Sequence, residues 1–247
     1  MAHPIGIDFG GSGIKAAPVD LETGKFAAER EKIATPKDAT PDAVAEVMAE
    51  LLDRFDDKSS PVGVTVPGVV RHGVVHSAAN IDKAWIGTDA DALLTKRLGR
   101  DVHVFNDADA AGVAELRYGA ARGHAGLVIL TTLGTGIGSA LLYNGVLVPN
   151  SELGHLEIDG HDAESRAANS VREEKDLSWE QWAERLTTYY TKVEALFSPD
   201  LFVVGGGVSK SADKFLHLID IETEIIPATL FNNAGIVGAA VITTEAD

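Results

Sequence analysis

The sequence predicts a mixed α/β protein built from two similar lobes, with a ligand site in the cleft between them. Strand-like and helix-like runs alternate along the 247 residues, a pattern typical of layered α/β folds. A glycine-rich turn between two apolar strand-like runs occurs twice, near residues 10 and 134, and a third glycine run at 205–207 follows another apolar strand. The recurrence indicates an internal duplication, and concave sites between lobes are where small ligands bind.

Composition narrows the class of protein. The chain has 37 acidic and 21 basic residues, a net charge of -16, which argues against a general nucleic-acid binder. Its absence of cysteine excludes disulfides, thiolate metal sites and cysteine nucleophiles. No apolar run approaches the roughly 18 residues of a membrane span, and no signal stretch precedes the first strand. We therefore expect a cytoplasmic protein with no membrane partner.

The first half begins with a hairpin whose glycines stand where a tight turn needs positive φ. Thr40 and Pro41 are typical of a helix start, and the apolar residues that follow have helical spacing. The expected elements are, in order, strands at 5–9, 14–19 and about 26–33, a helix at 40–55, strands at 62–66 and 73–76, a helix at 88–98, a strand at 102–105 and a helix at 108–118.

The second half repeats the hairpin and then adds a long helix. Ser178 and Gln181 form a capping box, and Trp182, Leu186, Tyr189, Val193 and Leu196 are the expected buried stripe. The expected elements are strands at 127–131 and 137–142, a helix at 178–197, a strand at 201–204, a helix at about 210–219, a strand at 222–226 and a helix from about 233. We predict a small lobe at 1–106, a large lobe at 107–231, and a C-terminal helix at about 232–247 that packs back onto the small lobe.

The first hairpin has the composition of a phosphate site. Gly10, Gly11 and Gly13 can point several backbone N–H groups in one direction, and Ser12 adds a hydroxyl. Asp8 could hold Mg²⁺ and Lys15 adds positive charge. The alternative is a tight turn that needs glycine for steric reasons only.

The second hairpin offers a similar nest. Thr132 and Thr135 lie beside Gly134 and Gly136, and two nests in corresponding places indicate one polyphosphorylated ligand held from both lobes. The third run, Gly205, Gly206 and Gly207, either lets a nucleotide approach closely or simply turns the chain.

Asp107 follows a strand end and begins a helix, next to Asn106. A carboxylate there could accept a proton from a substrate hydroxyl during phosphoryl transfer. The alternative is that Asp107 only caps the helix.

A second polar cluster lies between residues 151 and 157. Glu152, His155 and Glu157 could hydrogen-bond adjacent hydroxyls of a sugar. Without cysteine or an HxxxH spacing, a metal site is the weaker interpretation.

Together these motifs resemble the ROK family of sugar kinases, within the actin-like ATPase superfamily. The resemblance covers nearly the whole chain and rests on Asp8 to Lys15, Leu133 to Gly138, Gly205 to Gly207 and Glu152 to His155. It implies a two-lobed actin-like ATPase (ribonuclease H-like) fold with a central cleft. It also implies a Mg²⁺-dependent phosphotransferase and often a homodimer.

The resemblance also implies roles for residues. Asp107 is the base that activates the sugar 6-hydroxyl, while Asn80, Asn106, Glu152 and His155 hold other hydroxyls. Many members carry a cysteine-rich zinc loop after this histidine, ending in a sugar-binding glutamate. Because cysteine is absent, we expect no structural zinc; Glu164 is the candidate for that glutamate and Glu157 is its rival.

Three segments resemble one branch of the family more closely: residues 73–87, the cysteine-free loop after His155, and residues 232–238. They look like the actinobacterial polyphosphate glucokinase branch and its glucomannokinase relative. The resemblance implies transfer from polyphosphate, and ATP as well, to glucose and possible acceptance of mannose. The net charge opposes a long polyanion, so a local basic track or Mg²⁺ is expected to offset it.

The alternatives are an ATP-only hexose kinase and a non-catalytic sugar sensor. A family repressor would need a DNA-binding motif ahead of the first strand, where only four residues precede Ile5. An actin-like filament protein would not need the Glu152/His155 pair.

Overall fold

A computed structural model describes residues 3–55 and 59–245. The chain divides into two units: Met1–Ala114 with Asn233–Asp247, and Glu115–Asn232. The division falls inside a helix, Asp107–Tyr118, rather than at its first residue. Of the predicted C-terminal helix, residues 246 and 247 lie outside the described residues.

The first unit is built on a sheet ordered β3-β2-β1-β5-β8, with β4 also paired with β2. Its strands are β1 Ile5–Gly10, β2 Gly13–Asp20, β3 Lys25–Phe26, β4 Glu31–Ile33, β5 Val62–Val66, β6 Val70–Arg71, β7 Val74–Val75 and β8 Val102–Asn106. Its helices are α1 Pro41–Asp53, α2 Ala90–Leu98, the start of α3 Asp107–Tyr118, and α7 Ala234–Thr243, with a 3₁₀ turn at Lys83–Trp85.

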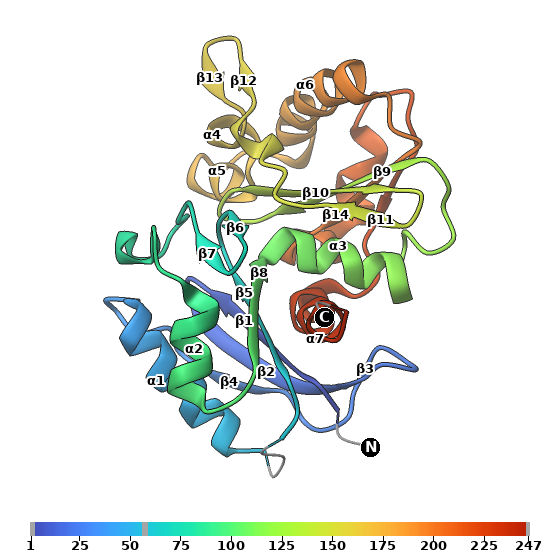
Figure 1. Cartoon of the computed structure of the whole chain (residues 1–247). Helices are drawn as coiled ribbons and strands as arrows, with labels where there is room; N and C mark the ends of the chain where they lie inside the picture. Colours follow the sequence, from blue (N-terminus) through green and yellow to red (C-terminus); the bar gives the residue numbers. More distant parts are fainter. Residues whose placement is uncertain (1–2, 56–58, 246–247) are drawn as a thin grey trace. The chain divides into compact units, whose positions relative to one another are not determined.

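The side chains of β1 point alternately to the two faces of the sheet, and each face packs against different helices. Ile5, Ile7 and Phe9 are fully buried in a core shared with α1 and α2, because successive strand residues face opposite sides. Gly6 faces the other way, where a Cβ would lie 1.9 Å from the Ile236 carbonyl oxygen of α7. The absent side chain therefore lets α7 lie directly on β1, and α7 also packs on β5. Figure 1 draws α7 in red, β1 in dark blue and β5 in cyan.

The second unit is built on a sheet ordered β11-β10-β9-β14-β15. Its strands are β9 Leu127–Leu133, β10 Ile137–Tyr143, β11 Val146–Val148, β12 Glu157–Ile158, β13 His161–Asp162, β14 Leu201–Gly205 and β15 Ile225–Pro227. Its helices are the end of α3, α4 Glu164–Ala167, α5 Asn169–Glu174 and α6 Trp179–Phe197, with 3₁₀ segments at Leu153–His155, Gly207–Lys214, Leu216–Leu218 and Phe231–Asn233.

Helix α6 covers the core of this sheet. The predicted capping box at Ser178 and Gln181 is confirmed, with both reciprocal bonds formed. Trp182, Leu186 and Tyr189 are buried as expected. Leu196 is 55% exposed, so its place in the buried stripe was wrong, because the core ends one turn before the helix does.

The two sheets confirm the predicted duplication. In both, an antiparallel hairpin is followed by two strands parallel to its first strand, in the orders β2-β1-β5-β8 and β10-β9-β14-β15. The carboxyl ends of parallel strands meet at one sheet edge, where α/β proteins bind ligands. In each unit, functional residues are therefore expected at this edge of the sheet.

Three local predictions need correction. The strand expected at about 26–33 is broken into β3 and β4, which both pair with β2. The helix expected at about 210–219 is instead two 3₁₀ segments, Gly207–Lys214 and Leu216–Leu218, with non-helical backbone at Ser211 within the first and at Phe215 between them. The strand expected at 222–226 starts later, at Ile225.

Within the described part of the chain, no helix is long and apolar enough to cross a membrane.

Candidate active site

The first glycine hairpin closes tightly without left-handed residues. Gly10 pairs with Gly13 across β1 and β2, but among the described glycines with positive φ neither they nor Gly11 is found. The expectation that the turn needs positive φ was wrong. A Cβ on Gly13 would lie 2.4 Å from Cε of Lys32, but this is the far end of a flexible side chain that can move aside.

Asp8 is held from three sides beside this hairpin. The Lys15 ammonium, directly opposite on β2, donates to Oδ2 at 2.8 Å, and the Thr65 hydroxyl of β5 donates to Oδ1 at 3.3 Å. A Cβ on Gly235, near the start of α7, would lie 3.1 Å from Oδ1, so the positive end of that helix is close. The carboxylate keeps unused lone pairs for a further ligand.

Asn80 lies next to the same hairpin. A Cβ on Gly11 would be 3.6 Å from the Asn80 carbonyl oxygen, and Asn80 itself has a left-handed backbone at φ 60°, a conformation that asparagine tolerates better than most residues. Its loop is fixed through Ala79, whose N–H donates to the Pro67 carbonyl at 2.9 Å. The structure thus brings the candidate sugar amide and the first phosphate turn together.

Asn106, rather than Asp107, makes the capping bond of α3. Its Oδ1 accepts the Asp109 N–H at 2.9 Å, three residues ahead, as N-cap side chains do. Its Nδ2 donates to the Gly68 carbonyl at 3.0 Å, and the side chain is 6% exposed. The Asp107 carboxylate accepts the adjacent Ala108 N–H at 2.9 Å, so the interpretation that Asp107 serves only as the helix cap is not supported.

These side chains share one edge of the first sheet. Asp8 is registered with Thr65, and the next residue, Val66, with Asn106, along the parallel strands β1, β5 and β8. Asp107 follows directly at the end of β8. Parallel register therefore gathers two carboxylates, an ammonium and the glycine turn where such sheets bind ligands.

The second hairpin is tied to its neighbouring helices. Ser170 donates from its N–H to the Gly134 carbonyl at 3.0 Å and from Oγ to the Thr135 carbonyl at 2.7 Å. Glu164, the first residue of α4, accepts the Ile137 N–H at 3.0 Å. A Cβ on Gly136 would lie 2.3 Å from the Glu164 carboxylate, so glycine is required for this close approach.

The third glycine run lies alongside this hairpin. Gly205 is registered with Thr132 across the parallel strands β14 and β9. Gly206 has φ 83°, and a Cβ there would lie 2.5 Å from the Leu133 carbonyl oxygen. Both the backbone angle and the lack of space demand glycine at this position, whereas Gly207 has open space around it.

The Glu152/His155 pair gains a third member that the sequence did not indicate. His155 Nδ1 lies 2.9 Å from Asp162 Oδ2, and His155 Nε2 lies 3.7 Å from Glu152 Oε2. The hydrogen bond with Asp162, together with nearby carboxylates, raises the pKa of His155. Burial raises the pKa of the Glu152 carboxyl. Glu157 is exposed on the short β12–β13 hairpin.

His155, Asp162 and Glu164 also have the arrangement of a possible metal site, because one ligand atom of each lies within 4.8 Å of the others. The hydrogen bond to Asp162 already engages one imidazole nitrogen, and the same carboxylate cluster can receive sugar hydroxyls.

Sequence reasoning missed the supporting residues Thr65, Asp162 and Ser170. Thr65 acts through strand register, and Ser170 through a contact 35 residues away in the chain; no local pattern marks either. Asp162 stood two residues before a predicted sugar ligand, and that spacing was the one available signal.

The family model that describes the ROK family matches residues 4–169. The chain belongs to the ROK family. It is 53% identical over 239 residues to a polyphosphate glucokinase of Mycobacterium tuberculosis, strain CDC 1551 / Oshkosh, covering 96% of this chain and 90% of the relative.

Solved structures agree with this membership. The inorganic polyphosphate/ATP-glucomannokinase of Arthrobacter sp. strain KM has a TM-score of 0.96 and 55% identity, with 100% of both chains covered. A ROK glucokinase of Streptomyces griseus, in complex with glucose and AMPPNP, has a TM-score of 0.83 at 23% identity over 98% of this chain and 99% of the other, and so shares the fold. The predicted actin-like ATPase fold is confirmed.

Proposed function

We propose that this ROK-family chain is a polyphosphate glucokinase, which transfers the terminal phosphoryl group of inorganic polyphosphate, and of ATP, to the 6-hydroxyl of glucose. The observation that carries the proposal is its 53% identity, over 96% of its length, to a polyphosphate glucokinase. The similarly close glucomannokinase supports both donors and adds mannose as a second acceptor.

Asp107 is the proposed general base. Asn106 makes the capping bond of α3, and in this proposal the Asp107 carboxylate, which follows it at the strand end, accepts the proton of the sugar hydroxyl. The hydroxyl oxygen then attacks the terminal phosphorus, the bond to the bridging oxygen breaks, and the shortened donor leaves with the electron pair. Asn106 is a positioning residue in this proposal, since both ends of its amide are engaged by the protein.

The first hairpin is the proposed donor site. Gly10, Gly11, Ser12 and Gly13 present the turn, and Lys15 supplies positive charge beside it. Mg²⁺ keeps several waters and takes one or two carboxylates besides phosphate oxygens, a demand that Asp8 fits with its unused lone pairs. When bound, the ion neutralises charge on the donor.

The second unit supplies the remaining proposed contacts. Thr132, Gly134, Thr135 and Gly136 bind donor phosphates, and Gly205, Gly206 and Gly207 receive the adenosine side when ATP is the donor. Glu152, His155 and Glu164 are the proposed sugar ligands of this unit, and Asn80 is the sugar ligand proposed for the first unit. Of the two rival glutamates we propose Glu164, because it is the one that contacts the hairpin.

The proposal includes Mg²⁺ as cofactor, a homodimer and a cytoplasmic location, as expected for a ROK kinase that acts on free glucose. The second candidate is a kinase for glucose or another hexose that uses ATP only, favoured by the shared fold of a glucokinase that binds AMPPNP.

Replacement of the base tests the proposal. With glucose, Mg²⁺ and both donors supplied, the wild-type chain should form glucose 6-phosphate, and Asp107→Asn should lower kcat by roughly 10² or more, the usual effect of losing a general base. Circular dichroism checks that the variant folds. Near wild-type turnover in folded Asp107→Asn would remove the base, and no product from the wild type would favour a non-catalytic sugar-binding protein.

A further inference from the structure

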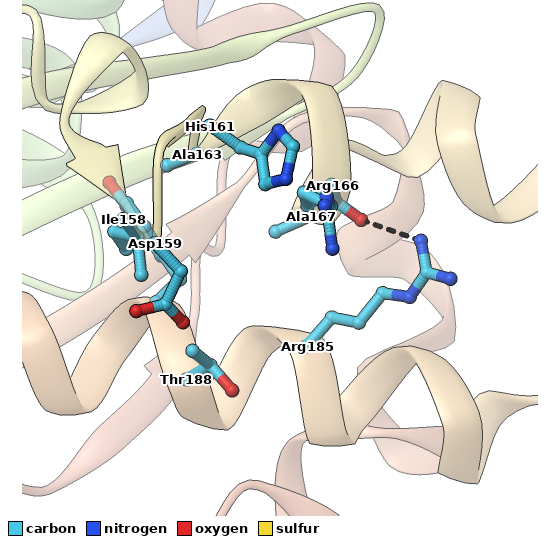
Figure 2. A pocket seen from close by; sticks show the side chains of 9 residues that line it. Ile158, Asp159, His161, Ala163, Arg166, Ala167, Arg185 and Thr188 are labelled. Atoms are coloured by element: carbon cyan, nitrogen blue, oxygen red, sulfur yellow. Dashed lines mark hydrogen bonds between the residues drawn. The ribbon is translucent and has the colours of Figure 1, made fainter.

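A pocket of about 230 Å³ lies in the second unit, and none of the glycine-turn residues described above lines it. It is formed by the β12–β13 hairpin, α4 and α6, and its polar lining residues are Asp159, His161, Arg166, Arg185, Thr188 and Tyr189. Figure 2 shows the labelled side chains arranged around a central hollow, with Arg166 and Arg185 on one side and Asp159 on the other. The volume is far larger than a single water requires.

The charge of this pocket is opposite to that of the chain. Two guanidinium groups line it against the one carboxylate of Asp159, in a chain with a net charge of -16. Among the described residues, neither Arg166 nor Arg185 forms an ion pair. Unpaired arginines that converge on one hollow favour an anionic ligand.

One of these arginines is held in place. Arg185 Nη1 donates to the Arg166 carbonyl at 3.1 Å, a bond that Figure 2 draws from α6 to α4. A guanidinium has five N–H donors, so most of its hydrogen-bonding capacity remains for a ligand. Anchoring also reduces the side-chain entropy that ligand binding would cost.

Tyr189 adds an unsatisfied donor. The residue is 1% exposed and lines the pocket, yet among the described residues its hydroxyl has no hydrogen-bond partner. The adjacent Tyr190 is equally buried, and its hydroxyl lies 2.6 Å from Thr131 Oγ1. Buried hydroxyls are normally paired, and burial raises the pKa of Tyr189, so its proton remains available to an acceptor.

We propose that this pocket is a binding site for a phosphate-bearing anion, held by Arg166, Arg185 and the buried Tyr189 hydroxyl. The lining is rich in donors, which suits a ligand made of acceptor oxygens. The planar guanidinium groups of the two arginines match the geometry of a phosphoryl group. The volume of the pocket leaves room for the molecule that carries the phosphoryl group. The site goes beyond the proposed function, because none of these residues has a part in the transfer reaction.

Calorimetric titration of the full chain tests the proposal with inorganic phosphate, glucose 6-phosphate and tripolyphosphate as separate probes. The variant is Arg166→Gln with Arg185→Gln, each replacement also being tested alone, and the control for each single replacement is Lys192→Gln, which removes one positive charge from an exposed position of α6 outside the pocket. We expect the double variant to bind at least one probe roughly tenfold more weakly, the loss expected for charged hydrogen bonds, while the control binds like the wild type. The probe affected identifies the source of the phosphoryl group.

Tyr189→Phe separates a ligand site from a structural role. A structural hydroxyl would lower the melting temperature when removed, whereas an unpartnered one should leave it unchanged or raise it in ligand-free protein. We expect Tyr189→Phe to keep its melting temperature and to bind the responsive probe more weakly. Unchanged affinity and stoichiometry for all three probes in the folded double variant would overturn the site, whatever the kinase assay gives.

Discussion

The two glycine hairpins occupy corresponding places in two sheets of the same order, yet their surroundings differ. The first carries an ammonium–carboxylate pair, Lys15 and Asp8, on the strands that lead into the turn. The second has a lone carboxylate, Glu164, packed against its glycine, and two carbonyls bonded by Ser170. The order of strands is therefore repeated, while the length of the turn and the charge of the side chains around it differ.

This difference indicates a division of labour. A positive charge beside the first turn favours donor phosphates, whereas the carboxylate beside the second can accept sugar hydroxyls, so the second hairpin is proposed to contact the sugar as well as donor phosphates. Glu164 bonds the hairpin through Ile137 and is also a proposed sugar ligand. We expect changes at the first hairpin to alter the kinetics of the donor and changes at the second to alter those of both substrates.

The largest effect is expected for Lys15→Met. Its side chain is only 24% exposed, so the lost charge is poorly replaced by water, and kcat/KM for the donor should fall by roughly 10². KM for glucose should change little. Initial rates at varied donor and varied glucose measure both. Lys25→Met on the exposed β3 is the charge-matched control; an equal loss there would mean that overall charge, not the hairpin, is responsible.

A smaller effect, about tenfold, is expected at Glu164. Glu164→Gln keeps an oxygen for the Ile137 N–H but removes the charge, so it should raise KM for glucose and leave donor KM unchanged or lower. Glu164→Ala also removes the hairpin bond and should raise KM for both substrates. If both variants raised the glucose KM equally and neither changed the donor KM, the coupling through Ile137 would be wrong.

A matched pair of hydroxyl deletions should have effects of a few fold. Thr35→Ala removes a 2.6 Å bond to the Gly10 carbonyl, and Ser170→Ala a 2.7 Å bond to the Thr135 carbonyl. Each bond is worth about 1 kcal/mol. Thr35→Ala should affect donor KM alone, and Ser170→Ala the KM of both substrates. Steady-state kinetics would contradict the comparison if the two patterns were reversed.

The smallest effect concerns pH and stability. The bond to Asp162 raises the pKa of His155 above its ordinary 6.5, so protonated His155 is favoured in the folded state. That stabilisation is fully present below pH 6.5 and is lost as pH rises through the raised pKa. Urea midpoints should show wild type exceeding Asp162→Asn most at the acidic end. A difference independent of pH would remove this pair as the cause.

The hairpins, the long helix and the duplication could be predicted from the sequence because local periodicity and the placement of glycines determine each of them. Thr65, Ser170 and the cap by Asn106 could not be predicted, since they depend on register and on contacts between distant segments. The glycines of the first turn show the same limit. Their clustering was visible in the sequence, but the backbone angles of the folded turn show that positive φ is not what requires them.

The identity of the phosphoryl donor is the central claim, and one assay tests it directly. Purified chain is given glucose, Mg²⁺ and nucleotide-free polyphosphate as the only donor, with ATP alone in a parallel reaction, and glucose 6-phosphate is measured. The account predicts product from polyphosphate alone. Product from ATP alone would contradict it and leave an ATP-dependent hexose kinase of the ROK family.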